Sequence, residues 1–279
     1  MKQLKINYNG KLVDANTPII TAQNRSFRYG DGFFETMRWH KNKIILANYH
    51  FERLFASLEL LGFEKPKHFT VAFLKKEIEE LLTKNNHLQN ARIRLNIFRG
   101  DGGLYDAENH HPNYIIETWA LPNYFQFNEN GLVIDVFKDA KKTCDNFSHL
   151  KTNNFLAYTM AALWAKKQQL NDAIVLNSNS NIADTTIANI WIVKDGIIKT
   201  PAIAEGCIAG AMRKYLLHFL QKENYPVVET TISVEDILQA NEVFLTNAIK
   251  GIAWVKQCGK SEYQTQLAPI LFNKFIQTL

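Results

Sequence analysis

The sequence predicts an α/β (α+β) protein, because patterns typical of helices and patterns typical of strands alternate along most of its 279 residues. Residues 122–130 are polar with scattered aromatic side chains, which makes them a plausible linker. We therefore expect two domains, residues 1–121 and residues 131–279. The chain is 46% hydrophobic and 21% charged, so it can bury a substantial core and is not expected to be disordered.

Charge and cysteine content exclude several classes of protein. The net charge of +5 is spread along the chain, so no basic block marks a surface for nucleic acid or membrane. Cys144, Cys207 and Cys258 are isolated and show no metal-ligand spacing, so we expect free thiols in a reducing compartment and no metal site. The N-terminus lacks an apolar core of signal-peptide length, and no apolar run could span a bilayer. We expect a soluble cytoplasmic protein.

The first expected elements are a hairpin, a strand and two helices. Asn9-Gly10 between short apolar stretches signals a type I′ turn. A strand is expected at residues 33–39, after a tight turn that glycines permit. Asn48 is expected to cap a helix that ends near Leu61, before Gly62. The second helix is expected at residues 71–83.

The rest of the chain continues the alternation. Apolar residues alternate with polar ones over residues 91–98, which predicts a half-buried strand. A flexible loop should follow at residues 99–105. Further strands are expected at residues 114–121, 132–137 and 173–177. A helix is expected after Lys151, because two sets of residues recur at helical spacing: Leu156, Met160 and Leu163, and Ala157, Ala161 and Ala165. Asp195-Gly196 should form a hairpin turn.

Six segments between about Asn16 and Val255 carry motifs in a definite order. They are Tyr29–Thr36 (Tyr-Gly-Asp-Gly-Phe-Phe-Glu-Thr), His50–Leu54, Ser148–Asn154, Asp184–Trp191, Gly206–Arg213 and Asn241–Ile252. Together they resemble the aminotransferase class IV family of pyridoxal 5′-phosphate (PLP) enzymes, fold type IV. That family includes branched-chain aminotransferases, D-amino-acid aminotransferases and aminodeoxychorismate lyases. Its members have a small N-terminal α/β domain and a larger C-terminal pseudobarrel domain, with PLP in the cleft between them, and they form homodimers.

The resemblance implies that Lys151 forms a Schiff base with PLP and then acts as general acid and base. Arg53 matches the arginine of the family motif His-x-x-Arg-Leu, which binds the PLP phosphate; the other interpretation of Arg53 is a surface arginine. Further phosphate contacts are expected from Ala211, Met212, Asn247 and Ala248, where a helix start and a turn offer N–H donors.

Asp184 stands where the family has a glutamate that keeps the pyridine nitrogen of PLP protonated, so that the ring can accept electrons. Its side chain is one methylene shorter, so either the backbone shifts or a water bridges the gap. The alternative is that Asp184 is only a turn residue. The resemblance also makes Tyr29, Thr36 and Tyr105 candidates for substrate binding, although Tyr29 could be an ordinary turn aromatic.

Three functions remain open. Asn154, Met212 and Asn247-Ala248 resemble the lyases, which favours a 4-amino-4-deoxychorismate lyase that forms 4-aminobenzoate and pyruvate for folate synthesis. An aminotransferase for branched-chain or D-amino acids is the alternative, because the loop at Leu104 has no charged anchor and Asp184 departs from the family. The third is a non-catalytic binding protein on the same fold, against which Lys151 argues.

Overall fold

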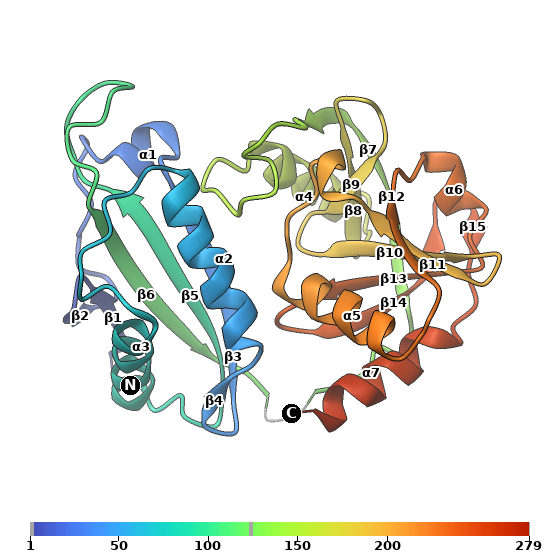
Figure 1. Ribbon diagram of the computed structural model, residues 1–279, viewed down its shortest axis with the longest axis horizontal. Coiled ribbons are helices and arrows are strands. Elements are labelled where there is room, and N and C mark those ends of the chain that lie inside the picture. The colour runs from blue at the N-terminus through green and yellow to red at the C-terminus, as the bar shows by residue number, and fades with distance from the viewer. Residues whose placement is uncertain (1–2, 123–124, 279) are drawn as a thin grey trace. The chain divides into compact units, whose positions relative to one another are not determined.

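The computed structural model describes residues 3–122 and 125–278, and these divide into two compact units (Figure 1). Unit 1 contains the described residues up to 122 together with the short segment Lys151–Asn154. Unit 2 contains Phe125–Leu150 and the described residues from Phe155 onward. The sequence pattern does not predict that Lys151–Asn154 packs with unit 1, and this packing decides where the candidate lysine lies.

Unit 1 is a six-stranded antiparallel sheet of order β2-β1-β6-β5-β3-β4. Its strands are β1 (Lys5–Tyr8), β2 (Lys11–Asp14), β3 (Gly32–His40), β4 (Lys43–Ile44), β5 (Asn90–Arg99) and β6 (Pro112–Ala120). Its helices are α1 (Arg25–Tyr29), α2 (Ala47–Leu60) and α3 (Val71–Asn85). The predicted hairpin is confirmed, because Asn9 and Gly10 turn with φ of 50° and 84°, as a type I′ turn requires.

Both predicted helices of unit 1 are present, but the prediction that Asn48 caps the first one is wrong. The N-cap of α2 is Leu46, whose φ of 56° turns the chain directly out of β4 into the helix, so Asn48 lies inside the first turn. Gly62, at φ 69°, follows the end of the helix as expected. Thr70 caps α3 by accepting a hydrogen bond from the amide of Phe73.

The sheet of unit 1 has two different faces. Alternate residues of β3 and β5, among them Phe33, Met37 and Ile93, pack with α2 and α3 in one core (Figure 1). The intervening residues of the same strands, such as Thr36 and Arg94, project from the opposite face and are only half-buried. The strand period thus separates an apolar face from a polar one.

Unit 2 is built on a nine-stranded mixed sheet that curls into a half-barrel, which confirms the predicted fold class. Its strands are β7 (Leu132–Lys142), β8 (Asp172–Asn177), β9 (Ile182–Thr185), β10 (Asn189–Lys194), β11 (Ile197–Pro201), β12 (Val227–Thr230), β13 (Glu242–Asn247), β14 (Gly251–Cys258) and β15 (Ser261–Glu262). Its helices are α4 (Leu156–Lys167), η1 (Ile203–Glu205), α5 (Ala211–Lys222), α6 (Val234–Leu238) and α7 (Leu267–Gln277). Within the residues that the structure describes, no helix combines the length and the apolar character needed to cross a membrane.

Strand β7 runs five residues beyond the end predicted for it at Phe137. Its pairing with β8 shifts register between Phe137 and Lys141, where the intervening residues bulge out of the ladder. After this bulge Lys141 is exposed and Lys142 is buried. The regular alternation of the sequence ends at the bulge, because Lys138 and Asp139 within it are both charged and exposed.

Helix α4 packs on the sheet through its alanines and not through its larger apolar residues. Ala161 and Ala165 are buried against β7 and β8, whereas the large residues of the stripe face outward. Leu156, Met160 and Leu163 are 71%, 45% and 57% exposed. Small alanines allow the helix to lie close to the sheet, and the apolar stripe is left uncovered in a single chain.

Candidate cofactor and substrate site

Lys151 is held against strand β3 by main-chain hydrogen bonds within unit 1. The carbonyl of Lys151 accepts from the amide of Phe34 at 2.9 Å, and the amide of Asn153 donates to the carbonyl of Gly32 at 2.9 Å. Thr152 forms a bridge with Phe33. The lysine therefore begins a short strand-like segment whose position is fixed by β3.

The glycines of the Tyr-Gly-Asp-Gly motif allow this segment to approach. A Cβ on Gly30 would lie 2.8 Å from the Cβ of Asn154, and φ of Gly30 is 67°. A Cβ on Gly32 would lie 2.5 Å from the carbonyl oxygen of Ile97 and 2.7 Å from the side-chain amide of Asn153. The motif thus has a structural reason, because any larger residue would push the lysine segment away from β3.

The amine of Lys151 lies on the polar face of the sheet. Its Nζ is 4.5 Å from the centroid of the Phe34 ring, and Cζ of Arg94 is 3.7 Å from the same centroid, so the two cationic groups are at most about 8 Å apart. Burial lowers the pKa of Arg94, and the carboxylate of Glu117 on β6 partly opposes that shift. Thr36 faces the same side as Phe34, two residues along β3.

Arg53 is bound to a buried carboxylate and is not a surface arginine. Its Nε donates to Oε1 of Glu35 at 2.7 Å and its Nη2 donates to Oε2 at 2.6 Å, a bidentate arrangement. The Nδ1–H of His50 donates to the same Oε2 at 2.7 Å. Glu35 and His50 are each 1% exposed, and Arg53 is 12% exposed. The interpretation of Arg53 as a solvated surface residue is therefore wrong.

The charge of this network is fixed by its contacts. Burial alone would raise the pKa of Glu35, but the guanidinium of Arg53 and the hydrogen bond from His50 outweigh it and bring the pKa to about 2. Burial lowers the pKa of His50, so its imidazole is neutral at neutral pH. Among the residues described, Nε2 of His50 is buried and has no hydrogen-bond partner. Glu35 and His50 are thus parts of the candidate site that sequence reasoning missed.

Two of the three candidate substrate residues lie together. Tyr29 and Tyr105 have ring centroids 5.5 Å apart and line one cavity of about 500 Å³ in unit 1. Arg25 holds the loop that carries Tyr105, because its Nη1 donates to the carbonyl of Gly102 at 3.1 Å and its Nε to Asp31 at 2.8 Å. Thr36 does not line this cavity. The loop expected to be flexible is therefore tied to α1 by charged hydrogen bonds.

Asp184 is the best-connected candidate in unit 2. Its Oδ2 accepts from the Tyr158 hydroxyl at 2.9 Å and from the Ile208 amide at 2.7 Å, and its Oδ1 accepts from Nδ2 of Asn189 at 2.8 Å. It lies in β9 and is 2% exposed, so the interpretation as a turn residue is wrong. Burial raises its pKa, and the ammonium of Lys142 is the largest opposing influence.

The candidate phosphate donors belong to α5 and β13, which pack against each other. Gly210 is the N-cap of α5 and no side chain caps this helix, so the amides of Ala211 and Met212 begin an uncapped first turn. A Cβ on Gly210 would lie 2.0 Å from Oδ1 of Asn189, so only glycine fits there. Oδ1 of Asn247 accepts hydrogen bonds from the amides of Ile249 and Lys250, at 3.0 and 2.8 Å. These bonds fix the turn that follows β13 and contains Ala248.

Each unit provides groups that fit a part of PLP. Unit 1 provides an amine at Lys151 and a bidentate guanidinium at Arg53. Unit 2 provides a buried carboxylate at Asp184 and an uncapped helix N-terminus at Ala211. The amine of Lys151 suits the aldehyde of PLP. The guanidinium of Arg53 and the N–H donors of the helix suit its phosphate, and the carboxylate of Asp184 suits its protonated ring nitrogen.

The chain is similar to known proteins both in sequence and in fold. The family model for amino-transferase class IV matches residues 32–258. The chain is 30% identical over 233 residues to an aminodeoxychorismate lyase of Vibrio harveyi, covering 82% of this chain and 84% of that protein. It is 27% identical over 256 residues to a D-alanine aminotransferase of Listeria monocytogenes, covering 88% and 84%.

Solved structures agree with this comparison. A putative 4-amino-4-deoxychorismate lyase from Legionella pneumophila superposes with a TM-score of 0.80 at 26% identity, over 95% of both chains. A branched-chain aminotransferase from Thermoproteus uzoniensis superposes with a TM-score of 0.86 at 22% identity, over 99% of this chain and 94% of that chain. The second likeness concerns the fold alone.

Proposed function

Since the chain belongs to the amino-transferase class IV family, whose members are PLP-dependent enzymes, we propose that it is a PLP-dependent 4-amino-4-deoxychorismate lyase. The reaction would release pyruvate and leave 4-aminobenzoate, a precursor for folate synthesis. The relatives include lyases and aminotransferases, so the family alone does not decide between them. The observation that favours the lyase is the pair of cations beside Phe34.

Each residue of the proposed site has a defined task. When bound, PLP supplies an aldehyde for the amine of the substrate and a ring that accepts electrons. Lys151 provides the amine that holds the cofactor and moves protons as general acid and base. Arg53, oriented by Glu35, and the amides of Ala211, Met212, Asn247 and Ala248 are proposed to bind the phosphate. Asp184 is proposed to bind the ring nitrogen.

The cations beside Phe34 suit a substrate with an amine at one end and a carboxylate at the other. Aminodeoxychorismate carries its amine and a carboxylate on opposite carbons of a six-membered ring, whereas an α-amino acid carries both groups on one carbon. Cζ of Arg94 lies over the ring of Phe34, 3.7 Å from its centroid, and Nζ of Lys151 lies 4.5 Å from the same centroid. An arginine beside the same ring as the lysine supports a carboxylate anchor separate from the reacting amine.

A direct assay tests the proposal. Purified protein with PLP is given aminodeoxychorismate in one tube and 2-oxoglutarate with a panel of L- and D-amino acids in another. We expect pyruvate and 4-aminobenzoate in the first tube. Turnover confined to the second tube would identify an aminotransferase, the alternative that the 27% identity to D-alanine and branched-chain enzymes keeps open.

An arginine variant tests the anchor. Arg94→Gln should raise KM for aminodeoxychorismate by about 10-fold or more, since a hydrogen bond to a charged group contributes roughly 1.5–3 kcal/mol. Arg92→Gln is the matched control, because Arg92 lies on the same strand and stacks on Trp119, 5.2 Å from its ring centroid. Equal KM values in wild type and Arg94→Gln would show that the substrate carboxylate binds elsewhere.

A homodimer in the cytoplasm completes the proposal. The outward-facing stripe of α4 (Leu156, Met160 and Leu163) supports it, because an uncovered apolar face of this kind is typical of a protein interface. Cys144, Cys207 and Cys258 are free thiols, which supports a reducing compartment.

A further inference from the structure

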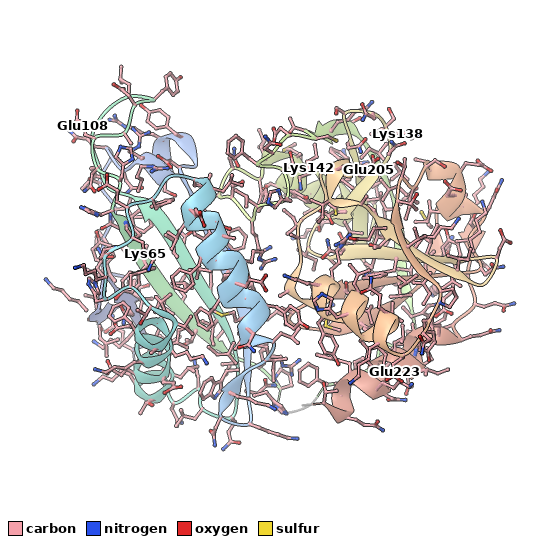
Figure 2. All side chains as sticks on the ribbon, in the orientation of Figure 1. Lys65, Glu108, Lys138, Lys142, Glu205 and Glu223 are labelled. Carbon is pink, nitrogen blue, oxygen red and sulfur yellow. The ribbon has the colours of Figure 1, made fainter. Side chains whose placement is uncertain are left out.

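Lys142 is a buried lysine that none of the family motifs contains. It is the last residue of β7, in the second half of the chain (Figure 2), and lies beyond the bulge of that strand. Its side chain is 8% exposed. Across the part of the chain that the structure describes, its Nζ makes no hydrogen bond. A buried ammonium is costly unless a negative charge lies near it, so the surroundings of Nζ decide what this lysine does.

The negative charge next to Lys142 is Asp184. Nζ of Lys142 lies 3.7 Å from Oδ2 of Asp184, and both side chains are almost completely buried. Nζ also lies 5.3 Å from the centroid of the Tyr158 ring, whose hydroxyl donates to the same Oδ2. The lysine therefore adds a positive charge to a carboxylate that already has its hydrogen bonds, and it reaches that carboxylate from a strand distant in sequence.

The other titratable groups around this pair do not replace Lys142 as a cation. Burial raises the pKa of Cys207 to about 12 and raises that of Tyr158 well above its ordinary value, so both stay protonated at neutral pH. His149 has a pKa lowered by burial and by Lys142 itself, so it is neutral there. Burial lowers the pKa of Lys142 itself, and the carboxylate of Asp184 is the largest influence that opposes this shift. Lys142 is left as the group that balances the charge of Asp184.

We propose that Lys142 is a positioning residue that keeps Asp184 ionised and fixed before any cofactor binds. Without this cation, a fully buried carboxylate with three neutral donors would take up a proton. The ammonium of Lys142 opposes this protonation, because it lowers the pKa that burial raises. The role of this pair toward the ring nitrogen of PLP rests on the proposed function. The pairing of Lys142 with Asp184 itself does not.

The test is the pH dependence of stability in the full chain without added PLP. Lys142→Met removes the charge, so the folded state should hold a proton on Asp184 that the unfolded state has lost. The unfolding equilibrium constant of Lys142→Met relative to wild type should then rise about tenfold for each pH unit above about 5. Lys142→Arg should restore the wild-type pH profile, because it keeps the charge.

Two further variants separate charge from packing. Lys142→Met combined with Asp184→Asn should lose the extra pH dependence, since no carboxylate remains to be protonated. Lys141→Met is the matched control, because Lys141 is the neighbouring lysine on β7 but is exposed. Its Nζ donates a hydrogen bond to Oγ of Ser180 at 2.6 Å. A pH profile of Lys142→Met that is parallel to wild type from pH 5.5 to 8 would overturn the proposal. A protein that binds no PLP but shows the expected profiles would refute only the proposed function.

Discussion

Glu35 provides the sharpest test of the charges assigned to the Arg53 network, because its own charge is buried and its partners are known. Glu35→Gln keeps the shape of the side chain and removes the negative charge. Arg53 would then lose the carboxylate that accepts both of its hydrogen bonds, and His50 would face an amide. The variant therefore leaves a largely buried guanidinium without its counter-charge.

The size of the effect follows from the pKa of Glu35. A pKa of about 2 in the folded protein, against an ordinary value of 4.5, corresponds to about 3 kcal/mol of stability at neutral pH. Because the pKa is depressed, this stability is fully present above about pH 4.5 and is lost as the pH falls toward 2. Less than half of it should remain at about pH 3.

The measurement is urea denaturation of the full chain without PLP, at pH 7 and at pH 3.5. We expect Glu35→Gln to lose about 3 kcal/mol at pH 7 and clearly less at pH 3.5. Glu59→Gln is the control, because Glu59 is exposed on the same helix, α2, as Arg53 and His50. If Glu35→Gln were as stable as wild type at pH 7, Glu35 would not be the buried carboxylate that pairs with the guanidinium of Arg53.

Two other predictions concern Lys151 and the outward stripe of α4. Borohydride reduction after incubation with PLP should leave a phosphopyridoxyl group on Lys151, and peptide mapping that finds it on another lysine would remove Lys151 from the site. Met160→Glu should convert the proposed dimer to a monomer, as measured by light scattering, because it places a charge on the proposed apolar interface. Ala162→Glu should leave the dimer intact, since Ala162 is exposed on the same helix but off the stripe; an unchanged dimer in Met160→Glu would contradict the assignment of this face.

Local patterns were sufficient for most elements of the fold. The Asn9-Gly10 turn and the strand at residues 91–98 depend on neighbouring residues alone, and both are present. The N-cap of α2 depends on how the chain turns from β4 into the helix at Leu46. The capping preference of Asn48 alone does not reveal this turn. The end of β7 depends on a bulge against β8, a partner that lies more than 30 residues away.

The residues that support the candidate site were harder to find for the same reason. Glu35 could be recognised only once it was known to share a face with Phe33 and Met37, since a carboxylate on an apolar face needs a buried partner. That partner is on α2, 18 residues along the chain. Lys142 and Asp184 are still farther apart in sequence. Sequence motifs identify groups that a ligand would touch, and the tertiary fold decides which groups stand behind them.

The two buried carboxylates of the candidate site are held in a similar way. Glu35 is bound by Arg53 and His50, and Asp184 by Tyr158, Asn189, Ile208 and the charge of Lys142. A buried ion pair often stabilises a protein no better than apolar residues of the same volume, so stability alone does not explain two of them. Each pair instead fixes the direction and charge of a group that the family resemblance assigns to a ligand. We infer that Asp184 is held in place by these donors, so a shorter acid than the family's glutamate remains defined in position by the contacts of its own unit.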